Sequence, residues 1–261
     1  MSTADQPVIE LRKVTRRFGR QLVLDAIDLA VERGRNTVII GRSGTGKSVL
    51  LKHIVGLLRP NRGEVYFEGR RIDTLGEHDL TPIRMQISFV FQLNALFDSM
   101  TVLENVEFPM VENGRQRLDR KGIRELAHRC LAVVGMDGFE HKRPGELSGG
   151  EKKRVAIARA IAMEPPPKVI LYDEPTAGLD PQRADVINKL VRQMQRDFKV
   201  TGVVVTHDMK SAQEVGDRIL MLHHGKFIAE GTPEEIMASR EPHVRNFVQG
   251  VADPDDIDTL R

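Results

Sequence analysis

The sequence contains a single cysteine, Cys130, and no tryptophan among its 261 residues. One cysteine excludes an intrachain disulfide, so a reducing compartment suits the chain, although a bacterial secreted protein can also lack disulfides. Excess charge of either sign is absent as well, because 39 basic residues nearly balance 37 acidic ones. A net charge of +2 gives no global field to hold a polyanion, and we therefore expect no nucleic-acid partner.

Long apolar runs are also missing. Runs such as 37–40 and 202–205 are far too short to cross a bilayer, so any work at a membrane would depend on the helices of a partner. Residues 1–6 lack a basic segment followed by an apolar stretch, and we expect no signal peptide. The composition is that of an ordinary globular protein, with 40% apolar and 29% charged residues.

Alternating strand and helix signals predict an α/β fold. Apolar and polar residues alternate over 8–14 and 27–31, which indicates amphipathic strands of an N-terminal antiparallel subdomain. Residues 218–230 indicate two more strands around a His-Gly turn. Short apolar runs typical of strands in a buried parallel or mixed sheet lie at 37–40, 87–91, 169–172 and 202–206.

From about 93 to 163 the apolar residues recur with helical spacing, which predicts a helical subdomain inserted into this core. Thr101 and Glu104 form a candidate capping box in it, and residues 113–121 are expected to be an exposed connection. A separate helix is expected from Ser48 to about Leu58. A second helix of the insertion should bury one face made of Leu126, Cys130, Val133 and Val134.

The expected domain covers residues 8–240, followed by a tail, 241–261, that could wrap around a neighbouring subunit. The acidic stretch 253–258 is expected to fray unless a partner orders it.

The loop from Gly41 to Ser48 matches the phosphate-binding pattern G-x-x-x-x-G-K-S. Glycines let backbone N–H groups turn inward around a phosphate, and a helix that starts there adds its positive dipole end. Lys47 would hold the β- and γ-phosphates, and the hydroxyl of Ser48 would ligate Mg²⁺. The alternative is a glycine turn with a solvated lysine, but a strand before the loop and a helix after it disfavour that alternative.

Two carboxylates, Asp173 and Glu174, end the apolar run that starts at Val169. An aspartate at this point of a strand can hold Mg²⁺, and Glu174 would polarise the attacking water. Such a pair can also simply end a strand, but its occurrence together with the phosphate loop favours the catalytic interpretation.

Leu147–Glu151 (Leu-Ser-Gly-Gly-Glu), followed by Lys-Lys-Arg-Val-Ala-Ile-Ala-Arg-Ala, resembles the signature motif of ATP-binding cassette proteins. The resemblance runs from about Val8 to about Gly231, and it implies a P-loop NTPase with a RecA-like core. In the family's order, the other matching positions are an adenine-stacking ring at Phe18, the Q-loop glutamine Gln92, the D-loop 177–180 and the switch histidine His207.

The resemblance implies ATP and Mg²⁺ as cofactors and a homodimer in which each signature faces the nucleotide of the other subunit. It implies catalytic roles for Lys47, Gln92, Glu174 and His207, and metal ligation by Ser48, Gln92 and Asp173. The implied nucleotide contacts are Phe18, Gly41, Arg42, Ser43, Gly44, Thr45, Gly46, Lys47, Ser48, Val49, Gln92, Ser148, Gly149, Gly150, Glu151 and Asp173.

Four positions depart from the family's commoner residues. Glu151 replaces glutamine, Gly178 replaces alanine, Phe18 replaces tyrosine and Val49 replaces threonine. None of these changes removes a catalytic group. We expect the carboxylate of Glu151 to point toward the basic residues 152–154.

Three phrases, 44–58, 91–106 and 247–250, resemble the ATPases of Mla-type systems, which maintain lipid asymmetry in the bacterial outer membrane. This implies phospholipid transport between inner and outer membranes, with a permease pair, an MCE-domain substrate-binding protein and a STAS-domain regulator as partners. The chain would then be cytoplasmic and peripheral on the inner membrane. Leu93–Met100 would pack the helical subdomain or receive a coupling helix of the permease.

Other interpretations remain open. The chain could serve a transporter of amino acids, metals or lipoproteins, or it could be a cassette protein without a transport role. Translation-type members usually carry two cassettes and repair-type members insert coiled coils, whereas this chain has one cassette and no sustained heptads. A regulator that only binds nucleotide would be expected to lack Glu174.

Overall fold

The computed structural model describes residues 6–112 and 118–252. The chain divides into unit 1, Met1–Leu75 with Val203–Arg261, and unit 2, Gly76–Gly202. We describe each unit by itself. The predicted exposed connection falls partly, and the acidic stretch 253–258 wholly, outside the described residues.

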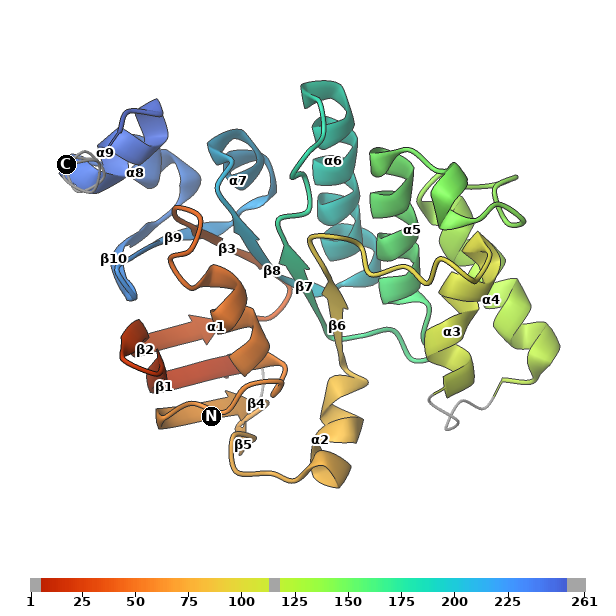
Figure 1. Ribbon diagram of the computed structural model, residues 1–261, viewed down its shortest axis with the longest axis horizontal. Coiled ribbons are helices and arrows are strands. Elements are labelled where there is room, and N and C mark those ends of the chain that lie inside the picture. Colours follow the sequence, from red (N-terminus) through yellow and green to blue (C-terminus); the bar gives the residue numbers. More distant parts are fainter. Residues whose placement is uncertain (1–5, 113–117, 253–261) are drawn as a thin grey trace. The chain divides into compact units, whose positions relative to one another are not determined.

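Unit 1 holds an antiparallel sheet and most strands of a mixed sheet (Figure 1). Its elements are β1 (Ile9–Phe18), β2 (Gln21–Val31), β3 (Asn36–Ile40), α1 (Lys47–Ile54), β4 (Arg62–Phe67), β5 (Arg70–Arg71), β8 (Thr201–Thr206, which begins in unit 2), α7 (Met209–Val215), β9 (Arg218–His223), β10 (Lys226–Gly231), α8 (Pro233–Met237) and α9 (Pro242–Gln249).

The N-terminal sheet is antiparallel, as predicted, and its strand order is β2-β1-β4-β5. Its apolar positions, such as Ile9, Leu11 and Val14, are buried, while their neighbours reach solvent. In the mixed sheet β3 pairs in parallel with β9, and β10 pairs antiparallel to β9. Every residue of β3 is buried, which confirms the prediction of a central strand.

Helix α1 starts at Lys47 but ends at Ile54 instead of near Leu58. Gly56 takes a left-handed backbone with φ of 70°, and the amides of the next two residues both donate to the carbonyl of Lys52. This turn satisfies the last carbonyls of the helix and redirects the chain.

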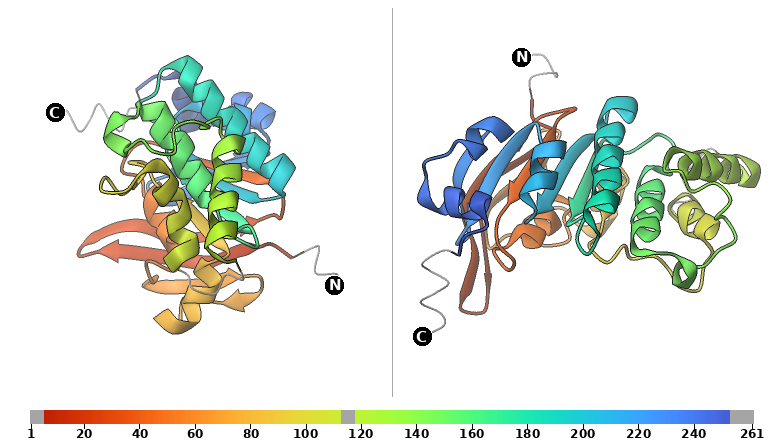
Figure 2. Two further views of the ribbon diagram at one scale, coloured as in Figure 1. Left: turned by 90° about the vertical axis from the view of Figure 1, so that its right-hand side faces the viewer. Right: turned by 90° about the horizontal axis from the view of Figure 1, so that it is seen from above.

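Unit 2 combines a parallel strand pair with a group of helices. Its elements are α2 (Glu77–Arg84), β6 (Ile87–Val90), α3 (Val102–Glu112), α4 (Arg120–Val133), the 3₁₀ turn η1 (Pro144–Glu146), α5 (Gly149–Ile161), β7 (Val169–Asp173) and α6 (Pro181–Phe198). Strands β6 and β7 are parallel, with Val90 opposite Tyr172. Helices α3, α4 and α5 pack together in both views of Figure 2.

The capping box before α3 and the buried face of α4 can both be compared with what the sequence predicted. The capping box is confirmed, because Thr101 N donates to Glu104 and Glu104 N donates to Thr101 Oγ1, over 2.7 and 3.2 Å. The buried face of α4 is shifted by about one residue from the predicted one. It consists of Ala127, Cys130, Leu131 and Val134.

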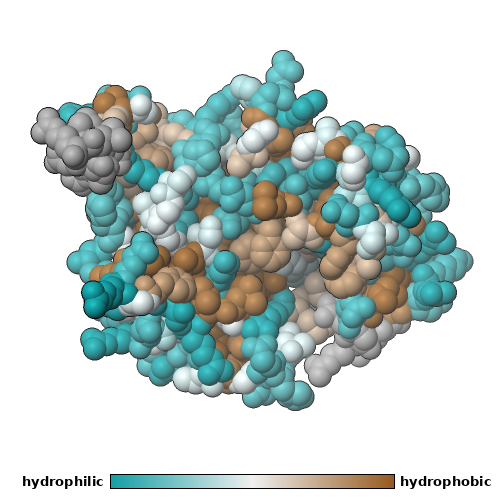
Figure 3. All heavy atoms as spheres, viewed as in Figure 1, coloured by the Kyte–Doolittle hydropathy of each residue, from teal (hydrophilic) through white to brown (hydrophobic). Residues whose placement is uncertain are grey.

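The face in Figure 3 is hydrophilic over most of its area, with apolar residues exposed in smaller areas. Among the large apolar side chains, Leu93 is the most exposed at 87%. Within residues 6–112 and 118–252, no helix has the length and hydropathy needed to span a membrane.

We predict that two glycines of unit 1 differ in their tolerance of a side chain. Gly63 has a φ of 91°, and a Cβ there would lie 2.4 Å from the Lys13 carbonyl oxygen, whereas Gly34 has a φ of 68° and open space around it. Gly34→Ala should cost about 1 kcal/mol for the left-handed backbone alone. Gly63→Ala should cost about 3 kcal/mol, because the β1–β4 contact must also shift. Urea unfolding measures both variants, and equal losses would contradict the steric argument.

Candidate functional site

The phosphate loop of unit 1 connects β3 to α1 with a backbone that only glycine tolerates. Gly41, Gly44 and Gly46 have φ of 153°, 81° and 104°. A Cβ on Gly41 would lie 2.4 Å from the carbonyl oxygen of Leu222, and one on Gly46 would lie 2.9 Å from Val23 Cγ1. Helix α1 then begins without a side-chain cap, which suits an anion bound at its N-terminus.

Lys47 is folded over this loop and is only 6% exposed. Its Nζ donates to the carbonyls of Gly41 and Arg42 over 2.7 and 2.8 Å. The hydroxyl of Thr45 donates to the carbonyl of Arg42 over 2.8 Å. The glycine cradle, the ammonium and the hydroxyl of Ser48 together form a donor set that fits a phosphate chain and one hard cation.

A cavity of about 420 Å³ opens beside the loop. Its lining residues are Gln21, Leu22, Val23, Arg42, Ser43, Gly44, Thr45, His223, His224 and Gly225. The β9–β10 turn reaches this cavity because Gly225 O accepts a hydrogen bond of 2.9 Å from Asp25 N. Sequence reasoning missed the two histidines, whose rings contact each other with centroids 4.2 Å apart.

Two predicted residues of unit 1, Phe18 and His207, lie outside both the phosphate loop and that lining. Phe18 ends β1 with 43% exposure, and the guanidinium of Arg16 lies over its ring at 4.5 Å. His207 follows β8 and is exposed. The next residue, Asp208, caps α7 by accepting hydrogen bonds from Lys210 N and Ser211 N, so the turn that carries His207 is fixed.

In unit 2, Asp173 ends β7 and Glu174 follows it, and each is only 7% exposed. The backbone of Glu174 is left-handed, with φ of 48°. Its carbonyl oxygen accepts hydrogen bonds from Ala177 N at 3.2 Å and from Lys153 Nζ at 3.3 Å. Burial lowers the pKa of the Lys153 ammonium, and the charges of the two carboxylates act in the opposite direction.

Gln92 follows β6 with an exposed side chain, and its carbonyl accepts a 2.6 Å hydrogen bond from Lys153 Nζ. Asn94 and Ala95, two and three residues after Gln92, have positive φ of 64° and 49°. Their carbonyls accept hydrogen bonds from the guanidinium of Arg159 over 2.8 and 2.6 Å. Burial lowers the pKa of Arg159. Sequence reasoning assigned no such contact to Lys153 or Arg159.

The signature residues form the start of α5, with Ser148 at the N-cap and Gly149 and Gly150 in the first turn. The expected orientation of Glu151 toward residues 152–154 stays a prediction, and the charge of Arg154 is among the influences that lower its pKa. Its carboxylate accepts a 2.7 Å hydrogen bond from Ser148 N and completes a capping box. The hydrogen bond with Ser148 also lowers the pKa of Glu151.

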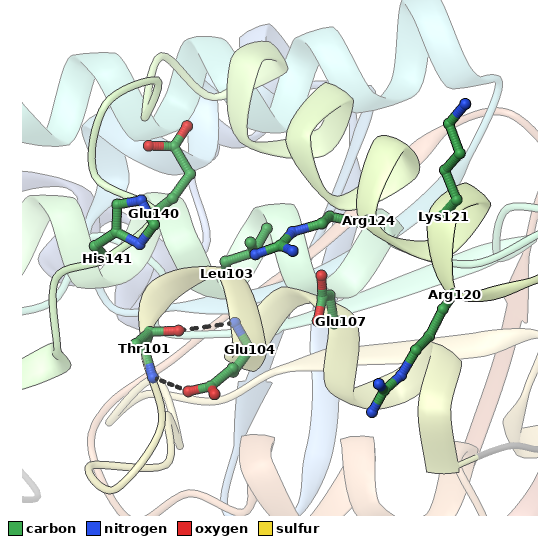
Figure 4. Close-up of a pocket in the computed structure, with 9 residues that line it drawn as sticks. All are labelled: Thr101, Leu103, Glu104, Glu107, Arg120, Lys121, Arg124, Glu140 and His141. Atoms are coloured by element: carbon green, nitrogen blue, oxygen red, sulfur yellow. Dashed lines mark hydrogen bonds between the residues drawn. The ribbon is translucent and has the colours of Figure 1, made fainter.

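A second cavity, of about 520 Å³, lies within unit 2 between α3, α4 and the loop before η1. Figure 4 shows the Arg124 side chain pointing toward Leu103 and Glu107, whereas Lys121 extends away from them. Burial raises the pKa of Glu107, and Arg124 is the main opposing influence. The sequence patterns did not single out this cavity. Its lining carries both acidic and basic side chains, which suits a peptide segment that also carries charges of both signs.

The predicted residues thus form two groups. Unit 1 holds Phe18, the loop 41–49 and His207, and unit 2 holds Gln92, the signature 148–151 and the carboxylates at 173 and 174. Within the described residues, no cluster of three or more His, Cys, Asp or Glu side chains is arranged to hold a metal by itself.

Residues 24–177 match the family described as ABC transporter. The chain belongs to the ATP-binding cassette family. Cassettes of this family bind and hydrolyse ATP on an α/β P-loop fold, and this chain is therefore an ABC ATPase.

Named relatives extend the likeness beyond the matched segment. MlaF of Escherichia coli, an "intermembrane phospholipid transport system ATP-binding protein", is 37% identical over 246 residues, 94% of this chain and 90% of MlaF. The "probable ribonucleotide transport ATP-binding protein mkl" of Mycobacterium tuberculosis is 38% identical over 242 residues, 93% of this chain but 66% of mkl. The dimeric structure of the cassette MJ0796 with ADP and Pi has a TM-score of 0.78 and 36% identity, covering 86% of this chain and 98% of that one.

We predict that Lys47→Ala weakens ATP binding by about 10- to 100-fold, because it removes a charged donor from the glycine loop. Lys52→Ala is the matched control, since Lys52 is exposed on the same helix. Titration with a fluorescent ATP analogue measures both affinities. Unchanged affinity in Lys47→Ala would exclude the loop as the phosphate site.

Proposed function

We propose that this ABC ATPase powers a phospholipid transporter of the Mla type, moving lipid between the inner and outer membranes. The observation that carries the proposal is the 37% identity to MlaF over 94% of this chain and 90% of MlaF. The relative mkl supports ribonucleotide transport as a second candidate, although this chain spans a smaller share of it.

The residues of both units have defined roles in this proposal. Lys47 binds the β- and γ-phosphates, Glu174 accepts a proton from the attacking water, and His207 donates a hydrogen bond to the γ-phosphate. Mg²⁺, when bound, neutralises charge on the phosphates, and Ser48, Gln92 and Asp173 would hold it. Burial of the Glu174 carboxylate supports its role, because a buried, oriented carboxylate needs little reorganisation when it accepts a proton.

Nucleotide contacts beyond the phosphates are assigned to Phe18, Val49 and the loop residues Arg42 and Thr45. A partner signature completes the site. Helix α5 begins at Gly149 and presents backbone N–H groups at its N-terminus, which can bind the γ-phosphate held by a second copy of the chain. The dimeric state of MJ0796 with ADP and Pi supports this arrangement.

Coupling to the permease would act next to Gln92. Phe97 packs against Phe108 with ring centroids 4.5 Å apart, and its amide donates to Asn105 over 2.8 Å, so it helps to fold the helical subdomain. Leu93 instead reaches solvent with 87% exposure and can enter a coupling helix interface. Both earlier alternatives for 93–100 therefore contribute to the proposal.

The proposal places the chain on the cytoplasmic face of a bacterial inner membrane, with a permease pair, an MCE-domain protein and a STAS-domain regulator. The tail from 241 onward would contact a neighbouring subunit. Helix α9 supports a contact there, because only Val244 of its residues is buried.

We predict that Glu174→Gln lowers ATP turnover by at least about 100-fold, since it removes the proton acceptor, while ATP affinity stays within about twofold. The variant should also accumulate as an ATP-bound dimer in size-exclusion chromatography. Glu125→Gln, an exposed site on α4, is the control and should keep full turnover. Undiminished turnover in Glu174→Gln would remove Glu174 from this role.

The cargo can be tested with the complex reconstituted from the genes that neighbour this one. ATP should drive the exchange of fluorescent phospholipid between vesicles, and Glu174→Gln should abolish it. Accumulation of radiolabelled ribonucleotide without lipid exchange would favour the second candidate instead.

A further inference from the structure

A single ammonium joins the ends of two neighbouring strands in unit 2. Strands β6 and β7 are parallel and in register, with Val90 opposite Tyr172. Gln92 and Glu174 each lie two residues further along, at the same edge of the sheet. Lys153 Nζ donates to the carbonyl of Gln92 at 2.6 Å and to the carbonyl of Glu174 at 3.3 Å.

The position of Lys153 is costly for a charged side chain. It is 3% exposed in the middle of α5, where a methionine or leucine would fill the same space without desolvating a charge. The two carbonyls accept hydrogen bonds from the ammonium, and the charges of Asp173 and Glu174 offset part of the cost of desolvation, which still lowers the pKa of Lys153. A buried lysine whose ammonium donates to two main-chain carbonyls supports a requirement beyond packing.

The backbone at and near the carbonyls that Lys153 holds takes conformations that are rare for residues with a Cβ. Glu174 has a φ of 48°, and Asn94 and Ala95, close to Gln92, have φ of 64° and 49°. Such conformations persist only where the surroundings over-determine them. From α5, Lys153 holds the carbonyls of Glu174 and Gln92. Arg159, on the same helix, holds the carbonyls of Asn94 and Ala95.

We propose that Lys153 is a positioning residue for ATP hydrolysis, which fixes the main chain of Glu174 and of Gln92 to the signature helix. The inference rests on the proposed role of Glu174 as the base. Lys153 touches neither carboxylate tip nor phosphate in this scheme. It sets the direction of the Glu174 side chain by holding the peptide from which that side chain departs.

The same contact gives the coupling a physical path. Helix α5 carries the signature at its N-terminus, so Lys153 ties the signature, Gln92 and Glu174 into one body within unit 2. A partner that displaces the exposed segment after Gln92 would therefore move the peptide of Glu174 as well.

Steady-state kinetics test the positioning role with three variants. Lys153→Met removes the charge and its donors at similar volume, and it should lower kcat about 10- to 100-fold with KM for ATP changed less than about threefold. Lys153→Arg keeps charge and donors and should restore most of kcat. Lys152→Met is the control, because the described residues include no hydrogen-bond or ion-pair partner for its ammonium. A kcat unchanged in Lys153→Met, equal losses in Lys152→Met, or KM rising as much as kcat falls would overturn the proposal.

Hydrogen exchange of the nucleotide-free protein gives a readout that does not depend on turnover. The amides of Asn94, Ala95 and Ala177 donate to nearby carbonyls in these two turns. Their exchange should rise at least about tenfold in Lys153→Met, while amides of α4 stay unchanged. If Lys153→Met does not fold, Lys153→Gln provides a shorter, neutral donor for the same measurement.

The two readouts separate this inference from the proposed function. Faster exchange in Lys153→Met, with undiminished turnover in Glu174→Gln, would show that Lys153 holds the turns but that Glu174 is not the base. Unchanged exchange at all three amides would overturn the inference even if Glu174→Gln is inactive.

Discussion

The glycine backbone between β3 and α1 is the constraint on which unit 1 depends. Three of its glycines have positive φ, and at two of them the absent side chain leaves space that other elements fill. The carbonyl of Leu222 approaches Gly41, and the side chain of Val23 approaches Gly46. The ends of β9 and β2 are therefore held against the loop, and the β9–β10 turn brings His223 and His224 to the cavity beside it. The form of the binding loop and the packing of β2, β3, β9 and β10 around it therefore both depend on the same glycines.

Unit 2 solves a different problem, the burial of charge at the end of a strand. Asp173 and Glu174 are nearly inaccessible, and so is Lys153, which faces them from α5. Each charge would be costly to bury alone, but the attraction between the ammonium and the two carboxylates offsets part of the cost of desolvation. The arrangement also leaves the ammonium's protons for main-chain carbonyls. One side chain therefore provides both electrostatic compensation and control of backbone conformation.

The sequence predicted the features that depend on local rules, and it missed those that depend on distant contacts. The capping box at Thr101 and the central strand at 37–40 follow from neighbouring residues, and the structure confirms both. Lys153 could not be singled out, because its partners lie 61 and 21 residues away. The capping role of Glu151 was missed, since charge attraction to 152–154 was weighed and the N-cap geometry was not. The roles of the predicted site residues stay predictions, and the left-handed backbone of Glu174 has no signal in its own sequence.

Under the proposed function, substrate choice rests with the partner subunits, whereas this chain carries the chemistry of ATP. The groups that bind and hydrolyse ATP are shared across the family, and neither the 420 Å³ cavity nor the 520 Å³ cavity is apolar and closed enough to hold a lipid tail. The 520 Å³ cavity in unit 2 is lined by charges of both signs, and Leu93 presents an isolated apolar side chain beside Gln92. These features suit a protein segment more than a lipid. The relatives' names differ in cargo, ribonucleotide for mkl and phospholipid for MlaF, although their identities to this chain are 38% and 37%.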